Sequence, residues 1–256
     1  MVWDPHQYLA FAGHRLRPAL DLLARIPDKG QKKIVDLGCG PGTVTTFLTD
    51  RWPDADVLGL DSSEEMLAKA GEAAPNARFE VADIGEWEPS EPVDLIYTNA
   101  ALHWLPDHQD LFPKLFSHLK PGGILAVQIP RNFSRPSHIS VAEAAKDGPW
   151  EATLAPMIKP PPTHAPNVYY DILAPLAGEL DIWETNYIQA LEGDNPVAEW
   201  TKGTWLRPFL DALDEPDKSG FEQAYRKRIA AAYPKQENGK TLLPFLRLFI
   251  VAGKPE

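Results

Sequence analysis

The amino-acid sequence predicts an α/β protein with a Rossmann-like, largely parallel sheet that helices cover on both faces. Three observations predict this fold. Short apolar segments alternate with amphipathic ones between residues 33 and 130, which is the pattern of strand and helix units in a parallel sheet. A glycine-rich turn directly follows the first apolar segment. Hydrophobic residues make up 44% of the 256 residues, which is enough for a substantial core.

Each element of this alternating region is predicted from its own local pattern. Apolar runs bounded by turn residues predict buried strands, whereas apolar residues three or four positions apart predict helices. Glu64 and Glu65 lie in the first turn of one such helix, where acidic side chains interact favourably with the helix dipole. The predicted strands cover residues 33–37, 57–61, 77–82, 93–98 and 124–129, and the predicted helices cover 43–52, 63–74 and 111–119.

The flanking segments follow different patterns. Residues 4–26 carry leucines at helical spacing, so we expect an N-terminal helical cover. After Pro130 the alternation fails and prolines crowd residues 159–166, so we expect an insertion of helix and irregular chain over residues 131–177. Beyond it, the pattern predicts strands over residues 181–188 and 246–252 and helices over 197–213 and 218–233.

Composition and charge exclude several classes of partner. The formal net charge of −11, without a run of Lys and Arg, disfavours binding to nucleic acid. No apolar stretch reaches the roughly 20 residues of a membrane helix, and the N-terminus lacks the pattern of a signal peptide, so we expect a cytoplasmic protein. The single cysteine allows no internal disulfide, and the seven histidines show no ligand spacing, so we expect no metal. No pattern predicts an oligomeric state.

The strongest functional motif is the segment Val-Asp-Leu-Gly-Cys-Gly-Pro-Gly over residues 35–42. Glycines let the backbone turn sharply and approach a ligand closely. A nicotinamide dehydrogenase would present Gly-x-Gly-x-x-Gly to a pyrophosphate, but Thr43 stands at the third glycine position. Asp36 would also lie unfavourably near a pyrophosphate, whereas its carboxylate suits the ammonium group of a methionine moiety. The charges therefore favour a zwitterionic ligand with a cationic sulfur.

Acidic residues follow the next two predicted strands. Asp61 lies about 20 residues after the glycine loop, the spacing at which a carboxylate accepts ribose hydroxyls. Asp83 is placed to accept the adenine amino group and Ile84 to cover the ring. Alone, each Asp is also explained as a helix cap or turn residue, and that alternative stays open for Ser62 and Ser63. The predicted donor-binding residues are Asp36, Gly38, Gly40, Asp61, Ser62, Met66, Asp83, Ile84 and Asn99.

With these motifs the sequence resembles the class I S-adenosylmethionine-dependent methyltransferases. The resemblance covers residues 32–130 and includes the Leu-Lys-Pro-Gly-Gly-Ile-Leu segment that follows the fourth helix. It implies S-adenosylmethionine as the methyl donor and a seven-stranded sheet whose last strand is antiparallel. We therefore expect one methyltransferase domain over 1–256, with a helical cover (1–31), a donor-binding core (32–130), acceptor-side insertions (131–180 and 195–235) and a C-terminal strand (241–254).

The segments outside the core resemble a narrower group within this class. Trp-Asp-Pro-His-Gln-Tyr over residues 3–8, Trp-Glu-Thr over 183–185 and Gly-Thr-Trp-Leu-Arg-Pro over 203–208 are similar to carboxyl methyltransferases of small polycarboxylic acids. The resemblance implies that a carboxylate of such an acid is methylated, which gives a monomethyl ester and S-adenosylhomocysteine. The segment Asn-Ala-Ala-Leu-His-Trp over 99–104 departs from the Asn-Pro-Pro-Tyr pattern of base-amino methylases, which disfavours an amine acceptor.

A carboxylate acceptor needs positioning more than it needs a base. With a reference pKa near 4, it is ionised at neutral pH. We predict that Gln7 and Trp104 donate hydrogen bonds to it as the catalytic pair. The alternative is that Trp104 only packs beneath the donor and Gln7 is a solvated helix residue.

The remaining carboxylates of a polycarboxylic acid call for guanidinium and hydroxyl donors. Arginine pairs with a carboxylate through two parallel hydrogen bonds. Most arginines are solvated surface charges, and most aromatic residues pack in a core, so these alternatives stay open. The predicted acceptor-binding residues flank the expected pocket and are Arg15, Arg131, Tyr170, Tyr187, Trp205 and Arg207.

Two further functions compete with this interpretation. Another small-molecule O-methyltransferase would use the same donor, but a fatty or terpenoid acid would need an apolar channel in place of the arginines. A non-catalytic donor-binding module would share the glycine loop, but it would leave the long insertions unexplained.

Overall fold

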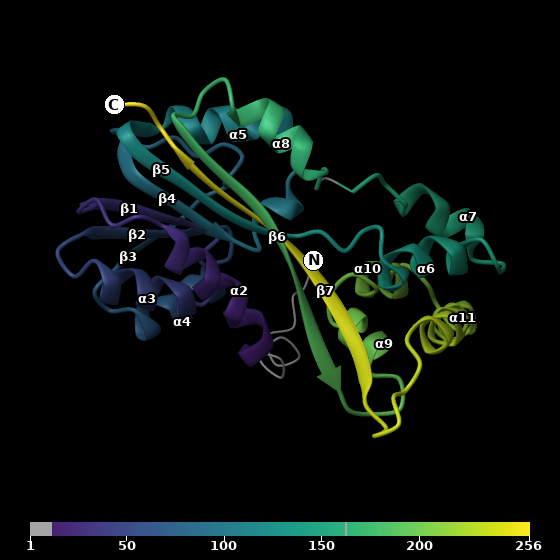
Figure 1. The fold of residues 1–256 in the computed structure, drawn as a ribbon. Coiled ribbons are helices and arrows are strands. Elements are labelled where there is room, and N and C mark those ends of the chain that lie inside the picture. Colours follow the sequence, from purple (N-terminus) through teal and green to yellow (C-terminus); the bar gives the residue numbers. More distant parts are fainter. Residues whose placement is uncertain (1–11, 162) are drawn as a thin grey trace. The chain divides into compact units, whose positions relative to one another are not determined.

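The computed structural model describes residues 12–161 and 163–256 of the chain (Figure 1). The helices alternate with strands through the first half of the chain, as the sequence predicts. The helices of the described residues are α2 (Ala12–Arg25), α3 (Thr43–Arg51), α4 (Glu64–Ala73), α5 (His108–Ser117), α6 (Pro136–Ala145), α7 (Glu151–Leu154), α8 (Pro166–Leu173), α9 (Pro196–Lys202), α10 (Arg207–Asp211) and α11 (Asp217–Ala232). Two 3-10 turns accompany them, η1 (Leu102–Trp104) and η2 (Ala155–Met157).

A seven-stranded sheet forms the centre of the fold. Its strands are β1 (Lys33–Leu37), β2 (Asp56–Asp61), β3 (Arg78–Val81), β4 (Val93–Asn99), β5 (Leu119–Pro130), β6 (Glu179–Leu191) and β7 (Thr241–Gly253). Their order is β3-β2-β1-β4-β5-β7-β6. The first five strands pair in parallel, and β7 pairs antiparallel with β5. The predicted seven-stranded sheet with an antiparallel last strand is therefore confirmed.

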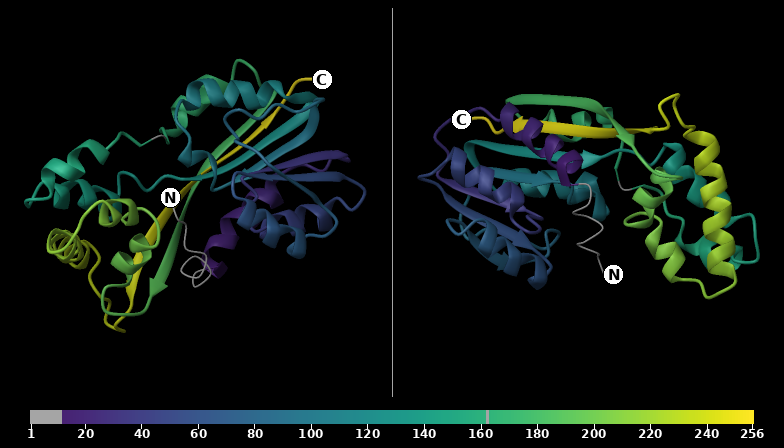
Figure 2. Two further views of the ribbon diagram at one scale, coloured as in Figure 1. Left: turned by 180° about the vertical axis from the view of Figure 1, so that it is seen from behind. Right: turned by 90° about the horizontal axis from the view of Figure 1, so that it is seen from below.

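The chain separates into two compact units, defined here within the described residues. The sheet unit comprises residues 15–130, 163–185 and 247–256, and the helical unit comprises 12–14, 131–161 and 186–246. β6 and β7 run side by side, as both views of Figure 2 show, and each strand contributes residues to both units.

Apolar residues fill one face of the sheet in the sheet unit. Strand residues such as Ile96 and Val127 pack there against Phe112 of α5 and Tyr169 of α8, and all four are buried. Figure 1 shows α5 and α8 on this side of the strands and α2, α3 and α4 on the other. Burial of these large side chains is the main stabilising term for this layer.

The opposite face of the sheet carries the polar residues of the site. Asp36 of β1 and Tyr97 of β4 are paired in register, so their side chains share this face. The Tyr97 hydroxyl donates to the backbone oxygen of Ala19 in α2 at 2.8 Å, which ties the helix to the sheet. Thr45 of α3 binds Asp36 on the same face.

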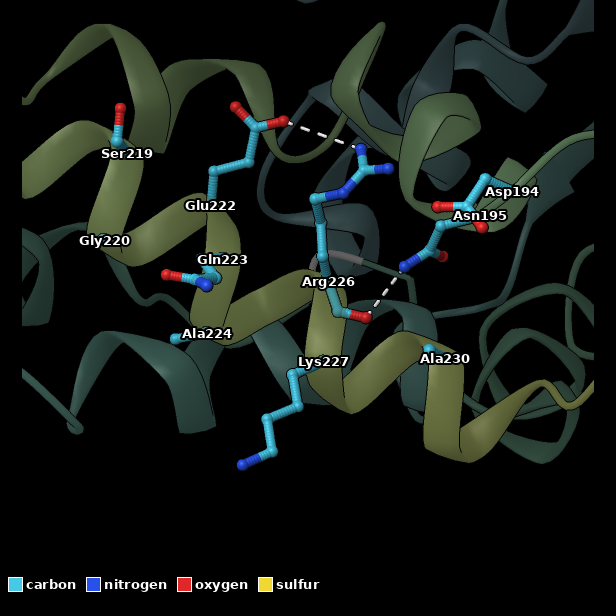
Figure 3. A pocket seen from close by; sticks show the side chains of 10 residues that line it. All are labelled: Asp194, Asn195, Ser219, Gly220, Glu222, Gln223, Ala224, Arg226, Lys227 and Ala230. Carbon is cyan, nitrogen blue, oxygen red and sulfur yellow. Dashed lines mark hydrogen bonds and ion pairs between the residues drawn. The ribbon is translucent and has the colours of Figure 1, made fainter.

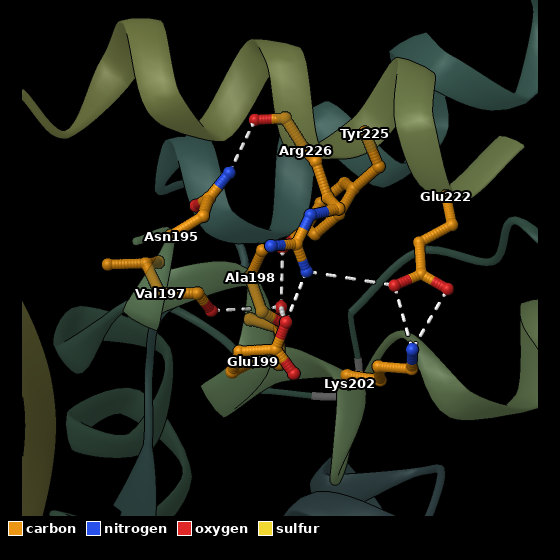
Figure 4. A network of polar contacts seen from close by, with 9 residues as sticks. Asn195, Val197, Ala198, Glu199, Lys202, Glu222, Tyr225 and Arg226 are labelled. Atoms are coloured by element: carbon orange, nitrogen blue, oxygen red, sulfur yellow. Dashed lines mark hydrogen bonds and ion pairs between the residues drawn. The ribbon is translucent and has the colours of Figure 1, made fainter. Parts of the chain in front are cut away.

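The helical unit has its own core around α11. Phe221, Tyr225 and Ile229 are buried on one side of this helix. The Tyr225 hydroxyl donates to the backbone oxygen of Ser137 at 2.9 Å and lies 2.7 Å from the Thr201 hydroxyl, which joins α11 to α6 and α9. Next to these buried residues on α11, charged side chains pair with those of α9, namely Glu222 with Lys202 and Arg226 with Glu199 (Figure 4).

Some elements begin at other residues than the sequence predicts. β5 begins at Leu119 and not at residue 124, because Leu119 pairs with Val93 on the far side of an irregularity in the β4–β5 ladder. α5 begins at His108, three residues before the predicted start. The segment after Pro130 contains α6, α7 and α8, and helix 197–213 is interrupted between α9 and α10. Within residues 12–161 and 163–256, none of the helices is long and apolar enough to cross a membrane.

Candidate active site

The glycine loop between β1 and α3 has a backbone that other residues adopt only with strain. Gly38 has φ +72° and Gly40 has φ +55°. A Cβ on Gly38 would lie 2.3 Å from the Cβ of Ala101, so the loop packs directly on the turn after β4. A Cβ on Gly40 would meet no atom of the described residues within 4 Å. Gly38 therefore permits close packing, and Gly40 leaves open space beside the loop.

Asp36 lies buried behind this loop. Its Oδ2 accepts a hydrogen bond from the Thr45 hydroxyl at 2.7 Å. Burial raises the pKa of Asp36 to about 7, with a further increase from nearby Asp61, although the Thr45 hydrogen bond opposes both. A buried carboxyl of this kind gains its charge most readily when a cation binds beside it.

Asp61 at the end of β2 holds the loop in shape. Its Oδ2 accepts the backbone N–H of Gly40, and its Oδ1 accepts that of Ser63, both at 2.9 Å. Ser63 then caps α4, because its hydroxyl accepts the N–H of Met66 at 3.3 Å. The cap interpretation is thus confirmed for Ser63. Ser62 is exposed and Met66 is buried in the first turn of α4.

The turn after β3 approaches the glycine loop through Ile84. The Ile84 Cδ1 lies 3.3 Å from the position that a Cβ on Gly38 would take. Asp83 is exposed, and its Oδ1 accepts the N–H of Gly85 at 2.8 Å, so it closes its own turn. The structure therefore brings Ile84 to the loop and places Asp83 at the adjacent surface.

The turn after β4 is strained. Ala100 has φ +54°, a value uncommon for a residue with a Cβ, and its N–H donates to the backbone oxygen of Gln128 at 2.9 Å. Such strain is concentrated at functional sites. The Oδ1 of the preceding Asn99 is buried and has no hydrogen-bond partner among the described residues. Ala101 of this turn packs against the glycine loop, and the predicted donor-binding Asn99 directly precedes the turn.

Of the two predicted catalytic residues, the structure describes Trp104 but not Gln7. Trp104 ends η1 and is 55% exposed, with its ring 4.6 Å from that of His103. Gln7 lies outside the described residues, and Arg15 lies in α2 with a side chain outside the described ones. The hydrogen-bonding roles of Gln7 and Trp104 stay predictions.

A buried histidine in α5 holds η1 through a hydrogen bond. His108 of α5 contacts the backbone oxygen of Leu102 through Nε2 at 2.9 Å and the Tyr169 hydroxyl through Nδ1 at 2.7 Å. The Tyr169 oxygen also accepts the N–H of His164 at 3.1 Å. Burial lowers the pKa of His108, so its neutral form joins α8 to the turn that carries Trp104.

The predicted acceptor-binding residues are distributed over both units. Tyr170 is 56% exposed on α8, which packs on the face of the sheet opposite to Asp36. Tyr187 is buried in β6. Arg207 lies at the start of α10, with its Nε 3.6 Å from Asp211 Oδ2. Within the helical unit, Trp205 packs against the rings of Phe133 and His138, and the backbone N–H of Arg131 donates to the backbone oxygen of Leu246. Their contacts with an acceptor stay predictions.

Two buried polar residues near the site were not predicted. Gln128 of β5 is fully buried, and Arg247 of β7 is 5% exposed with its Nη1 3.5 Å from Gln128 Oε1. The sequence does carry a signal for both. Each is a single polar residue inside an otherwise apolar strand, in Ile-Leu-Ala-Val-Gln-Ile and in Leu-Arg-Leu-Phe-Ile-Val. Buried polar residues of this kind are uncommon without a partner or a function.

A surface hollow of about 790 Å³ lies elsewhere, on the helical unit (Figure 3). It is lined by Asp194, Asn195 and one side of α11, and its Glu222 and Arg226 are paired with each other and with neighbouring side chains. None of the predicted site residues lines it. Within the part of the chain that the structure describes, no group of three His, Cys, Asp or Glu side chains could hold a metal ion.

Comparison with solved structures supports the fold. The chain is similar to the YcgJ protein from Bacillus subtilis, with a TM-score of 0.58 and 13% identity over 94% of this chain and 99% of that chain. It is also similar to a phosphoethanolamine N-methyltransferase 2 from Haemonchus contortus, with a TM-score of 0.54 and 18% identity over 94% of this chain and 53% of that chain. At these identities the likeness shows the fold alone.

Sequence comparison identifies the family. The model of the family described as "Methyltransferase domain" matches residues 34–123, and with the sheet and the glycine loop it defines a class I S-adenosylmethionine-dependent methyltransferase. Trans-aconitate 2-methyltransferases from Azoarcus sp. (strain BH72) and Escherichia coli O139:H28 are 49% and 45% identical, over 98% and 99% of both chains. The chain belongs to the trans-aconitate 2-methyltransferase family, so the predicted donor and enzyme class are confirmed.

Proposed function

We propose that this chain transfers the methyl group of S-adenosylmethionine to a carboxylate of trans-aconitate, which gives a monomethyl ester and S-adenosylhomocysteine. One observation carries the proposal. The likeness to trans-aconitate 2-methyltransferases extends over 98% of the chain and so includes the segments outside the donor-binding core. Those segments distinguish acceptors, because the core is shared by enzymes that methylate many different compounds.

The residues around the glycine loop fit the donor. The open space beside Gly40 leaves room for a ligand against the backbone, and Asp36 offers a buried carboxylate to an ammonium group. Asp61 would hold the ribose, while Asp83 and Ile84 would hold the adenine. Ser62, Met66 and Asn99 would complete the contacts. When bound, the donor supplies an electrophilic methyl group on a cationic sulfur.

On the acceptor side, the protein has to orient an anion and exclude water. A carboxylate is already ionised at neutral pH, so the reaction needs an oxygen held in line with the methyl group and not a general base. Gln7 and Trp104 would hold the reacting carboxylate through neutral hydrogen bonds. Arg15, Arg131 and Arg207 would hold the other carboxylates, and Tyr170, Tyr187 and Trp205 would add hydrogen bonds or packing.

A substrate panel tests this function directly. Transfer of a labelled methyl group is measured to trans-aconitate, cis-aconitate, isocitrate and a long-chain fatty acid, and the products are identified by mass spectrometry. We expect trans-aconitate to give the highest kcat/KM. A preference for the long-chain acid would contradict the proposal and would favour the apolar-channel alternative.

A further inference from the structure

Gln128 and Arg247 lie on the same face of the sheet as the donor-binding residues. Asn99 and Gln128 are paired in register, as are Gln128 and Phe249, and Arg247 precedes Phe249 by two residues. Paired residues share a face, and so do residues two apart in a strand. Asp36 belongs to this face through its pairing with Tyr97, which precedes Asn99 by two residues. The five polar and charged positions therefore point to one side of the sheet.

Both residues also lie at the correct end of the strands. Gln128 is near the carboxyl end of β5, and Arg247 is paired with Pro130, the last residue of that strand. In open α/β sheets, ligands bind beyond the carboxyl ends of the parallel strands. The strained turn at Ala100 leaves β4 at the same end, and its N–H donates to the backbone oxygen of Gln128.

The hydrogen-bonding capacity here exceeds what the described residues use. Gln128 is fully buried, yet its Nε2 has no hydrogen-bond partner among the described residues. Its Oε1 has only a long contact, 3.5 Å, with Arg247 Nη1. An unsatisfied buried donor destabilises the folded protein, so a ligand oxygen that reaches Nε2 would remove this cost.

We propose that Gln128 and Arg247 form an acceptor subsite that binds a carboxylate of the polycarboxylic acid which is not methylated. Arg247 pairs with this carboxylate, and Gln128 Nε2 donates to it. The guanidinium suits a spectator carboxylate because pairing withdraws electron density from the oxygens, which would slow their attack on the methyl group. This inference rests on the proposed function, since it requires an acceptor with more than one carboxylate.

The variant Gln128→Glu separates this role from a structural one. A glutamate of nearly the same size would place its own carboxylate beside Arg247 and form an intramolecular ion pair with the guanidinium. A merely structural pair would tolerate the change or gain from it. An acceptor subsite would be blocked by it, because the acid would meet a carboxylate in the place of an amide donor.

The experiment compares Gln128→Glu and Arg247→Lys with the wild type. Gln223→Glu is the matched control, because it adds the same charge at an exposed position of α11. S-adenosylhomocysteine binding is measured by calorimetry, and KM and kcat are measured for trans-aconitate and for fumarate, which has one carboxylate fewer. We expect both variants to raise the KM for trans-aconitate at least tenfold and to change the Kd for S-adenosylhomocysteine less than twofold. The change with fumarate should be much smaller.

Three results would overturn the inference. They are an unchanged KM for trans-aconitate in both variants, an equal loss with fumarate, and an equal loss of S-adenosylhomocysteine affinity. If Gln128→Glu does not fold, Arg247→Lys decides by the same criteria, because it keeps the positive charge.

A failure of the subsite and a failure of the proposed function are distinguished by the binding of tricarboxylic acids to the wild type loaded with S-adenosylhomocysteine. If another tricarboxylate binds through Arg247 but trans-aconitate is not methylated, the proposed function fails and the subsite stands. If no carboxylic acid binds, the subsite fails as well.

Discussion

At the scale of single residues, Asp36 links the donor site to pH. Its pKa of about 7 means that much of the carboxyl is protonated at pH 6 in the ligand-free protein. Pairing with the ammonium group of the donor requires the ionised form, so binding releases a proton below pH 7. We expect the affinity for S-adenosylhomocysteine to rise about tenfold from pH 6 to pH 8. Calorimetry in buffers of different ionisation enthalpy measures both the affinity and the proton release.

The variant Asp36→Asn tests whether Asp36 is the group that makes the affinity for S-adenosylhomocysteine depend on pH. It should lower the affinity at pH 8 at least tenfold and abolish the dependence on pH, because the amide cannot ionise. Asp83→Asn is the control, since it removes an exposed carboxylate from the same predicted set and should keep the dependence. A pH dependence that persists in Asp36→Asn would show that another group titrates.

The residues of the site differ in how far sequence predicts them. Gly38, Gly40 and Asp61 follow strand ends in a spacing that backbone geometry dictates, and the structure brings them together. Gln128 and Arg247 come from strands that are far apart in sequence, and only the sheet order makes them neighbours. A contact of this kind has no local pattern, so the lone polar residue in each apolar strand was the only signal.

At the scale of elements, the Tyr169 hydroxyl adds a hydrogen bond to the apolar packing of α8 on α5. Tyr169 binds His108 and the N–H of His164, and His108 in turn binds Leu102 of η1. The variant Tyr169→Phe leaves these groups without their partner, and we expect it to lower the free energy of unfolding by about 1–3 kcal/mol. Denaturant unfolding measures the change. Tyr170→Phe at the adjacent exposed position should leave stability unchanged, and an equal loss in both variants would contradict the assignment.

Element bounds were predicted best where local sequence determines them. β1 has the predicted bounds, because charged and glycine residues limit its apolar run. The predicted start of β5 was wrong. The Lys-Pro-Gly-Gly segment predicts a turn, whereas Leu119 already pairs with Val93 of β4, before the irregularity in the β4–β5 ladder. Tertiary pairing overrode the local signal there. The helices after Pro130 were expected only as a class, because short helices begun by proline have little periodicity.

At the scale of the whole molecule, the two units carry buried groups with opposite responses to acid. In the helical unit, burial lowers the pKa of His138 to about 4, so this residue stabilises the fold above pH 6.5 and loses that contribution as the pH falls towards 4. In the sheet unit, Asp36 has a raised pKa, so its contribution is greatest below about pH 4 and is lost as the pH rises through 7.

The variant His138→Gln tests the first of these responses. Between pH 6.5 and pH 4.5 the wild type should lose about 2 kcal/mol relative to this variant, because only the histidine takes up a proton on unfolding. Thermal unfolding of both proteins across this range gives the difference. A difference that does not change with pH would exclude His138 as a source of acid sensitivity.

The overall fold was predictable to a greater extent than its division into units. Alternation of strands and helices defines a parallel sheet, and the order of motifs defines its donor-binding half. The two compact units are built from segments that are not contiguous in sequence, so the change of pattern after Pro130 does not show which later segments pack together. The division into a helical cover, a donor-binding core and acceptor-side insertions stays a prediction.

Asp61 has a consequence for the use of altered donors. Both of its oxygens already bind backbone N–H groups, at Gly40 and at Ser63, so only their remaining lone pairs are available to a sugar. A substitution meant to accommodate a modified ribose would therefore also release the glycine loop and the start of α4. Engineering for analogues with a changed nucleoside should begin at Asp83 or Ile84 and leave this carboxylate intact.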